Sequence, residues 1–177
     1  MLVADWMTRN PKTCEPDFTL YETRGIMRQA GIRHLPVKAG GRLVGIITDR
    51  DIRNFLLPSD VPELLKERFD LLRVRRVKDS MIPNPITIES GASLERAAGI
   101  FVREKFGSLP VVDNEQLVGI ITEQDVLTGL LGSLGVGQKS FRFTLEFPRQ
   151  DSEVLSQTLR ILEGQGVSIL SVLSEPD

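Results

Sequence analysis

The sequence has few of the residues on which several protein classes depend. It contains one cysteine, Cys14, so no disulfide can form within the chain. No run of about eighteen apolar residues is present, so no transmembrane helix is expected. Asp5, Trp6 and Arg9 stand where a signal peptide needs an apolar core, which predicts a soluble cytoplasmic protein. The net charge of −2 gives no indication of nucleic-acid or anionic-membrane binding.

Catalytic groups are equally scarce. His34 is the single histidine and Cys14 the single cysteine. A cluster of metal ligands, or a nucleophile paired with a histidine base, is therefore not indicated by the sequence. No pair of carboxylates is singled out by the pattern either. We therefore expect a protein that is not an enzyme and holds no metal.

An internal repeat is the strongest positive signal. Residues 3–57 align without a gap on residues 77–131, an offset of 74, and 22 of the 55 pairs are identical. The identities include Leu-Pro-Val at 35–37 and 109–111, and the run Leu-Val-Gly-Ile-Ile-Thr at 43–48 and 117–122. A match of this quality predicts one supersecondary unit folded twice.

Each repeat has the pattern β-α-β-β-α. The first should contain an extended piece at 12–14, a helix at 18–30 ended by Gly31, and a strand at 32–38. A tight turn at Gly40-Gly41, a buried strand at 43–48 and a second helix follow. The second repeat should contain a helix at 93–105, strands at 106–113 and 116–122, and a helix from about Glu123.

Three further segments complete the chain. Residues 58–76 have a helical pattern and carry the basic residues Lys66, Arg68, Arg73, Arg75 and Arg76. This charge run is either a solvated helix face or a basic wall beside a bound phosphate. Residues 133–139 form a Gly-rich linker. In residues 140–177, alternation at 141–147 predicts a strand, Asp151 or Ser152 begins a helix, and 167–173 is a second strand.

The repeated motifs resemble a known family. The stretches IRHLPV…LVGIITDRDI and FGSLPVV…LVGIITEQDV are similar to CBS repeats over roughly residues 1–132. The resemblance implies an α/β (α+β) fold in which repeats 1–57 and 77–132 pack sheet to sheet as a Bateman module. The tail resembles the first half of an ACT domain. This order, with a basic connector at 58–76, is similar to the AcuB type of protein linked to acetoin utilisation.

Two Thr-x-x-Asp motifs are the candidate binding sites. Thr48 with Asp51, and Thr122 with Asp125, lie where a strand turns into a helix. The spacing alone matches a capping box, but a helix N-terminus also attracts anions. The resemblance implies that each aspartate binds the ribose of an adenosyl ligand and each threonine binds its phosphate.

The segments before the two Leu-Pro-Val motifs differ. Family analogy places them beside the phosphates of their own repeat and the adenine of the other. Arg33, His34 and Arg50 would face phosphate in the first repeat, against Gly107, Ser108 and Gln124 in the second. The first site should therefore prefer phosphorylated ligands. The whole expected nucleotide-binding set is Lys12, Thr13, Ile32, Arg33, His34, Pro36, Thr48, Arg50, Asp51, Ile86, Thr87, Phe106, Gly107, Ser108, Pro110, Thr122 and Asp125.

These features predict a regulatory module. It would bind AMP, ADP, ATP, S-adenosylmethionine or NAD between its repeats and transmit occupancy to a partner or across a homodimer. The alternative is a protein-interaction module with no physiological nucleotide ligand. The residues leave the choice among these ligands open.

Overall fold

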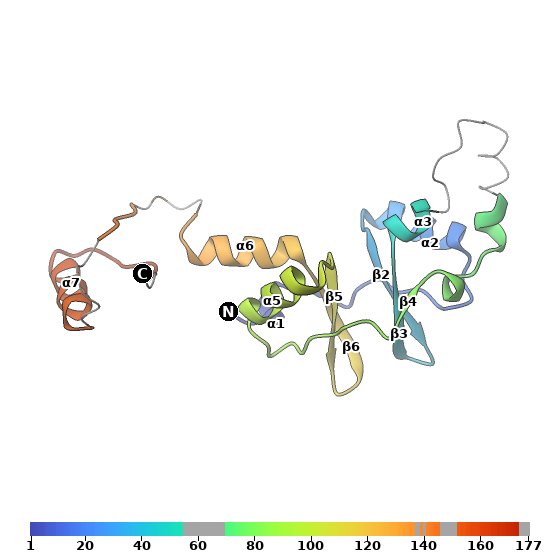
Figure 1. Cartoon of the computed structure of the whole chain (residues 1–177), viewed down its shortest axis with the longest axis horizontal. Coiled ribbons are helices and arrows are strands. Elements are labelled where there is room, and N and C mark those ends of the chain that lie inside the picture. The colour runs from blue at the N-terminus through green and yellow to red at the C-terminus, as the bar shows by residue number, and fades with distance from the viewer. Residues whose placement is uncertain (55–69, 137–138, 140, 146–151, 174–177) are drawn as a thin grey trace. The chain divides into compact units, whose positions relative to one another are not determined.

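The computed structural model describes residues 1–54, 70–136, 139, 141–145 and 152–173. These residues belong to two units, Met1–Val126 and Leu127–Asp177. Figure 1 shows the chain coloured along its sequence. Helix α6 (Glu123–Ser133) begins in the first unit and continues in the second, where α7 (Ser152–Gly164) follows.

The helices and strands follow one another along the chain in this order: α1 (Val3–Trp6), β1 (Thr8–Arg9), α2 (Leu20–Ala30), β2 (His34–Ala39), β3 (Arg42–Thr48), α3 (Asp49–Asn54), the 3₁₀ turn η1 (Val77–Asp79), β4 (Ile82–Pro83), α5 (Leu94–Glu104), β5 (Ser108–Asp113), β6 (Gln116–Thr122), α6 (Glu123–Ser133) and α7 (Ser152–Gly164).

Two three-stranded sheets form the centre of the first unit, and each contains strands from both repeats. Their orders are β2-β3-β4 and β1-β6-β5. The hairpins β2-β3 and β5-β6 have the same register, with His34 opposite Thr48 and Ser108 opposite Thr122. The short β1 of the first repeat pairs with β6, while β4 of the second repeat pairs with β3. Neither repeat therefore completes its sheet alone.

The helix starts show the same exchange. The N–H of Leu20, which begins α2, donates to the carbonyl of Arg75 at 3.0 Å, and the N–H of Leu94, which begins α5, donates to the carbonyl of Met1 at 3.1 Å. Because 20 and 94, and 1 and 75, differ by 74, the two bonds are the same bond in two repeats. The first N–H groups of a helix have no partner within it, and here the lead-in of the other repeat supplies one. These paired bonds confirm the predicted two-fold repeat.

Local signals account for the element boundaries. Helix α2 begins after Thr19, whose side chain accepts from the N–H of Glu22, and it ends at Gly31 with φ +66°. Gly40 and Gly41, with φ +55° and +84°, make the expected tight turn. In the second repeat the corresponding turn uses Asn114 and Glu115, both also at positive φ.

The core of the first repeat includes residues that lie beyond it in the sequence. Leu72 of the connector and Val77, the first residue of the second repeat, are fully buried there, so this part of the chain packs into the first repeat. This cluster of buried residues consists of Cys14, Leu20, Met27, Leu35, Val37, Ile47, Ile52, Leu72 and Val77.

The tail differs from the prediction. Helix α7 is present, but residues 141–145 and 167–173, the described parts of these two segments, form no strand. The expected cap Asp151 and residues 146–147 lie outside the described residues. Alternating apolar residues make a strand only when a neighbouring strand and a covering face are available, and a two-stranded sheet is marginal alone. Phe141 and Phe143 are instead 91% and 73% exposed.

Candidate functional site

The two Thr-x-x-Asp corners have the same geometry. At the end of β3, the N–H and Oγ1–H of Thr48 donate to Oδ2 of Asp51 at 2.8 and 2.7 Å. The N–H of Asp51 donates back to Thr48 Oγ1 at 3.2 Å. Thr122 and Asp125 repeat these bonds at 2.8, 2.6 and 3.2 Å. Both corners are half-buried, and Oδ1 of each aspartate takes no part in the box.

This geometry is that of a helix N-terminal capping box, whether or not a ligand binds there. Thr19 and Glu22 at the start of α2 make the same three bonds at 2.8, 2.7 and 3.2 Å, although nothing in the sequence marks them as a ligand site. The box alone therefore does not identify a binding site. The corners differ from Thr19 and Glu22 in their place, because each follows a central strand and stands opposite the start of its hairpin partner.

The first corner has three basic residues near it in the sequence or across the hairpin. His34 is half-buried and lies opposite Thr48 in the hairpin. Its burial, and then the charge of Arg33, hold the pKa of His34 below its usual 6.5, while Asp51 acts in the opposite direction. Arg33, which precedes His34, and Arg50, which lies between Thr48 and Asp51 in the sequence, are both exposed. The carbonyl of Arg33 accepts from the N–H of Asp49 at 2.9 Å and so fixes the start of α3.

The second corner has the same backbone and lower charge. The carbonyl of Gly107 accepts from the N–H of Glu123 at 3.3 Å, as that of Arg33 does in the first repeat. Ser108 occupies the position of His34 but is buried, with 6% of its surface exposed. Gln124, in the place of Arg50, is exposed. The second corner therefore has fewer basic residues in its sequence than the first, and the preference for phosphate that we expect from this difference stays a prediction.

Residues 12–14 and 86–88, which contain Lys12, Thr13, Ile86 and Thr87 of the expected nucleotide-binding set, lie along the edge of each hairpin. Cys14 N–H donates to the carbonyl of Pro36, and Ile88 N–H donates to that of Pro110, both at 3.1 Å. Pro36 and Pro110 are buried within their strands, so they hold these segments in place. Of the other expected contacts, Lys12, Ile86 and Thr87 are exposed, and Thr13, Ile32 and Phe106 are half-buried.

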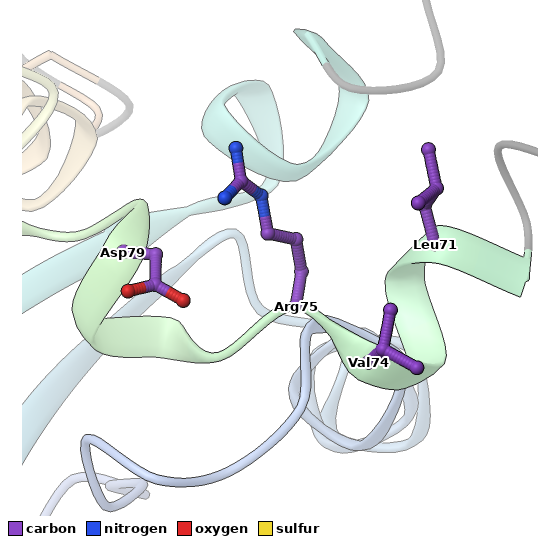
Figure 2. Close-up of a pocket in the computed structure, with 4 residues that line it drawn as sticks. All are labelled: Leu71, Val74, Arg75 and Asp79. Carbon is purple, nitrogen blue, oxygen red and sulfur yellow. The ribbon is translucent and has the colours of Figure 1, made fainter.

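Two surface hollows of about 380 Å³ do not coincide with the corners. Figure 2 shows the first, lined by Leu71, Val74, Arg75 and Asp79, of which Arg75 belongs to the basic connector and none to the expected nucleotide-binding set. The second contains Thr87 as its one expected residue and is lined by Arg42, Leu43, Asn84, Pro85, Thr87, Val112 and Glu115. Cavity volume therefore does not locate the candidate site.

Two arginines of the described part of the connector contact residues near the start of α2, and the basic wall beside a phosphate stays a prediction. Arg73 lies over the ring of Tyr21, 5.3 Å from its centroid, and Arg76 donates to the carbonyl of Asp17 at 2.8 Å. Both arginines thus bind near the start of α2. Residues 70–74 are helical as predicted, whereas Lys66 and Arg68 lie outside the described residues.

Sequence reasoning missed two contacts that hold the exchanged strands. A Cβ at Gly45 in β3 would lie 2.5 Å from Sδ of Met81, and a Cβ at Gly119 in β6 would collide with Sδ of Met7. The available signal was that Met7 and Gly45 recur at the 74-residue offset as Met81 and Gly119. Over the same described residues, no group of three or more His, Cys, Asp or Glu side chains could hold a metal ion. No described helix is long and apolar enough to cross a membrane.

Comparison with solved structures gives the same architecture. An AcuB acetoin utilisation protein from Vibrio cholerae has 29% identity and a TM-score of 0.63, over 80% of this chain and 98% of that one. CBSX2, of Arabidopsis thaliana, in complex with AMP has 27% identity and a TM-score of 0.63, over 74% and 97% of the two chains. The CBS domain pair of protein MJ0100, in complex with 5′-methylthioadenosine and S-adenosylmethionine, has 27% identity and a TM-score of 0.62, over 76% and 98%.

Sequence comparison identifies the same domains. A CBS domain-containing protein of Dictyostelium discoideum is 35% identical over 133 residues, which are 74% of this chain and 92% of that protein. The chain spans between 20% and 46% of several other curated relatives. The CBS domain profile matches residues 3–58 and 74–132. The chain therefore belongs to the CBS domain family and carries two CBS domains in tandem.

Proposed function

We propose that this protein is a non-catalytic sensor that binds an adenosyl ligand at its Thr48/Asp51 and Thr122/Asp125 corners. The observation that carries the proposal is the presence of two equivalent corners in a CBS pair, at the ends of β3 and β6, the central strands with which the exchanged β4 and β1 pair. Two related CBS pairs of the same fold are complexes with AMP and with S-adenosylmethionine and 5′-methylthioadenosine. The ligand class we propose is accordingly adenosine with a phosphate or a sulfonium substituent.

The groups at each corner suit such a ligand. The capping box uses Oδ2 of the aspartate, so Oδ1 is available to accept a hydrogen bond from a ribose hydroxyl. The N-terminus of the helix that follows favours negative charge. Around Asp51, the exposed guanidinium groups of Arg33 and Arg50 and the imidazole of His34 supply donors to a phosphate.

The two corners should differ in affinity. Gly107 and Gln124 bring no cation to the second corner, and charge-assisted bonds are about twice as strong as neutral ones. One such bond more at the first corner corresponds to about 1.4 kcal/mol, or tenfold in affinity. We therefore assign phosphorylated ligands to the Thr48/Asp51 corner and weaker or less charged adenosyl ligands to Thr122/Asp125.

Regulation would follow from the strand exchange. A ligand that prefers one arrangement of the repeats stabilises that arrangement by its difference in affinity. Because β1 and β4 each join the sheet of the other repeat, a change at one corner acts on both repeats. A homodimer partner or a target protein would respond to it.

A second candidate, a protein-interaction module without a nucleotide ligand, is favoured by the tail. Its described segments expose the apolar side chains Phe141, Phe143, Leu145, Leu170, Val172 and Leu173. Pairing with a second copy would supply the missing strand neighbours. The two candidates are separable because only the first requires Asp51 and Asp125.

Calorimetric titration with AMP tests the proposal. Asp51→Ala should abolish the tight, salt-sensitive binding, since two charge-assisted bonds to ribose hydroxyls contribute about 3 kcal/mol, or roughly a hundredfold. Asp125→Ala should leave most of that binding in place. Loss of the tighter phase in Asp125→Ala instead would reverse the assignment of the two corners.

The matched control is Glu22→Ala. It removes a capping box of the same geometry at the start of α2, away from both corners. Like Asp51→Ala, it should lower the unfolding free energy by about 1 kcal/mol. AMP affinity should fall only in Asp51→Ala, and an equal fall in both variants would mean that the corner acts only as a cap.

A further inference from the structure

Position 107 favours glycine because a neighbouring side chain leaves no room for a Cβ atom, and not because the backbone there has a positive φ. Its φ lies outside the left-handed region in which glycine is preferred. A Cβ built on it, however, would lie 2.9 Å from Nε2 and 3.4 Å from Cε1 of His34. The imidazole of the first repeat therefore occupies the volume that a side chain of the second repeat would need.

Other glycines show that this is a specific contact. A Cβ at Gly25, Gly91 or Gly99 would meet nothing within 4 Å. Those at Gly45 and Gly119 would meet methionine sulfurs, which are apolar and flexible. The neighbour of Gly107 is a polar ring with two nitrogen atoms, and it comes from the opposite repeat.

His34 and Gly107 are each linked to one of the two corners. His34 is opposite Thr48, whose hydroxyl donates to Asp51. Gly107 accepts the N–H of Glu123, the first residue of the helix after Thr122. The contact is one-sided, because the 74-residue offset puts Arg33 at the position of Gly107 and Ser108 at that of His34.

Resting on the function proposed above, we propose that Gly107 is a positioning residue, a notch in the second repeat that holds the His34 imidazole beside the Thr48/Asp51 corner. The second repeat thereby sets the phosphate affinity of the site built around the first. A side chain at position 107 displaces the ring away from this corner and removes one donor to the phosphate.

A double-mutant cycle tests the notch, with AMP and adenosine as probes. Gly107→Ala should weaken AMP binding about tenfold and change adenosine binding little, because adenosine has no phosphate. His34→Ala should weaken AMP binding to a similar degree. The double variant should bind AMP no more weakly than His34→Ala, since the displaced ring is already absent. Additive losses, or AMP affinity unchanged in Gly107→Ala, would overturn the proposal.

Gly99→Ala is the control, because it adds the same methyl group in open space within α5. It should bind AMP as the wild type does. A loss in this variant equal to that of Gly107→Ala would attribute the effect to glycine replacement in general and would also overturn the notch.

A readout without nucleotide separates this proposal from the proposed function. His34 is the single histidine, so its ring signals in a proton NMR titration need no assignment. The ring faces Arg33 and Asp51, and its burial lowers its pKa. Gly107→Ala should move that pKa towards its usual value, and unchanged titration curves would refute the notch. If wild-type protein binds no AMP but the curve moves, the proposed function fails and the notch stands.

Discussion

Replacing Gly45 by alanine should weaken the exchange of strands on which both corners depend. A Cβ there would lie 2.5 Å from Met81 Sδ, about 0.9 Å inside the shortest ordinary contact of 3.4 Å, and 3.1 Å from the carbonyl oxygen of Ile82. The thioether can turn aside, but the Ile82 carbonyl is backbone of β4, which is the exchanged strand itself. Overpacking of this kind costs about 1 to 3 kcal/mol of unfolding free energy.

Urea unfolding followed by the fluorescence of Trp6, the single tryptophan, measures this loss. Trp6 ends α1, directly before the β1 segment that joins β6, so it reports on the exchanged region. Gly119→Ala should lose a similar amount because Met7 has the equivalent contact. Gly25→Ala is the control: it lies in α2 with no atom within 4 Å and should gain up to about 1 kcal/mol.

A double variant isolates the contact. In a Met81→Ala background the cost of Gly45→Ala should fall to the part due to the Ile82 carbonyl. If Gly45→Ala is as stable as Gly25→Ala, or if its cost is the same with and without Met81, the packing described for the exchanged strands is wrong.

Three other outcomes are expected. Because the folded pKa of His34 lies below its usual 6.5, the folded state resists protonation, and the unfolding free energy should fall as the pH drops below about 6.5. Urea titrations should show a smaller fall in His34→Gln, and equal pH dependence in both proteins would contradict this. Burial raises the pKa of Cys14 to about 11, so the thiol should react with a disulfide reagent at about pH 8 only in denaturant. Rapid reaction of the native protein would show that the core of the first repeat opens. If the tail pairs with a second copy, Phe143→Ser should reduce the mass measured by light scattering from dimer to monomer. A wild-type monomer, or a variant that stays dimeric, would exclude that pairing.

Elements governed by neighbours in the sequence were predictable. The 74-residue repeat, the terminating Gly31 and the Gly40-Gly41 turn act through local conformation, and the structure has them where expected, whereas α2 begins at Leu20 and not at residue 18. The exchange of β1 and β4 was not predictable, because two-residue strands have no periodicity and their partners lie in the other repeat. The tail strands were predicted from alternation at 141–147, which indicates a suitable face but not a neighbour to pair with.

The candidate site was predictable at its corners and less so around them. The Thr-x-x-Asp spacing located two half-buried boxes, and the structure shows them equivalent. Gly107 and Ser108 were expected to face a ligand because of their place before Leu-Pro-Val. In the structure Ser108 is buried and Gly107 makes room for His34, a contact between the repeats that the sequence does not display.

The most direct test of the central claim compares two calorimetric titrations with AMP, one on the wild-type chain and one on the Asp51→Ala/Asp125→Ala double variant. The wild type should bind, with the tighter phase weakened by salt, because phosphate would meet cations at the first corner. The double variant should retain its fold, as each lost box costs about 1 kcal/mol, and should show no binding. Equal binding by both proteins, or no binding by the wild type at millimolar AMP, would contradict the assignment of the two corners as adenosyl sites.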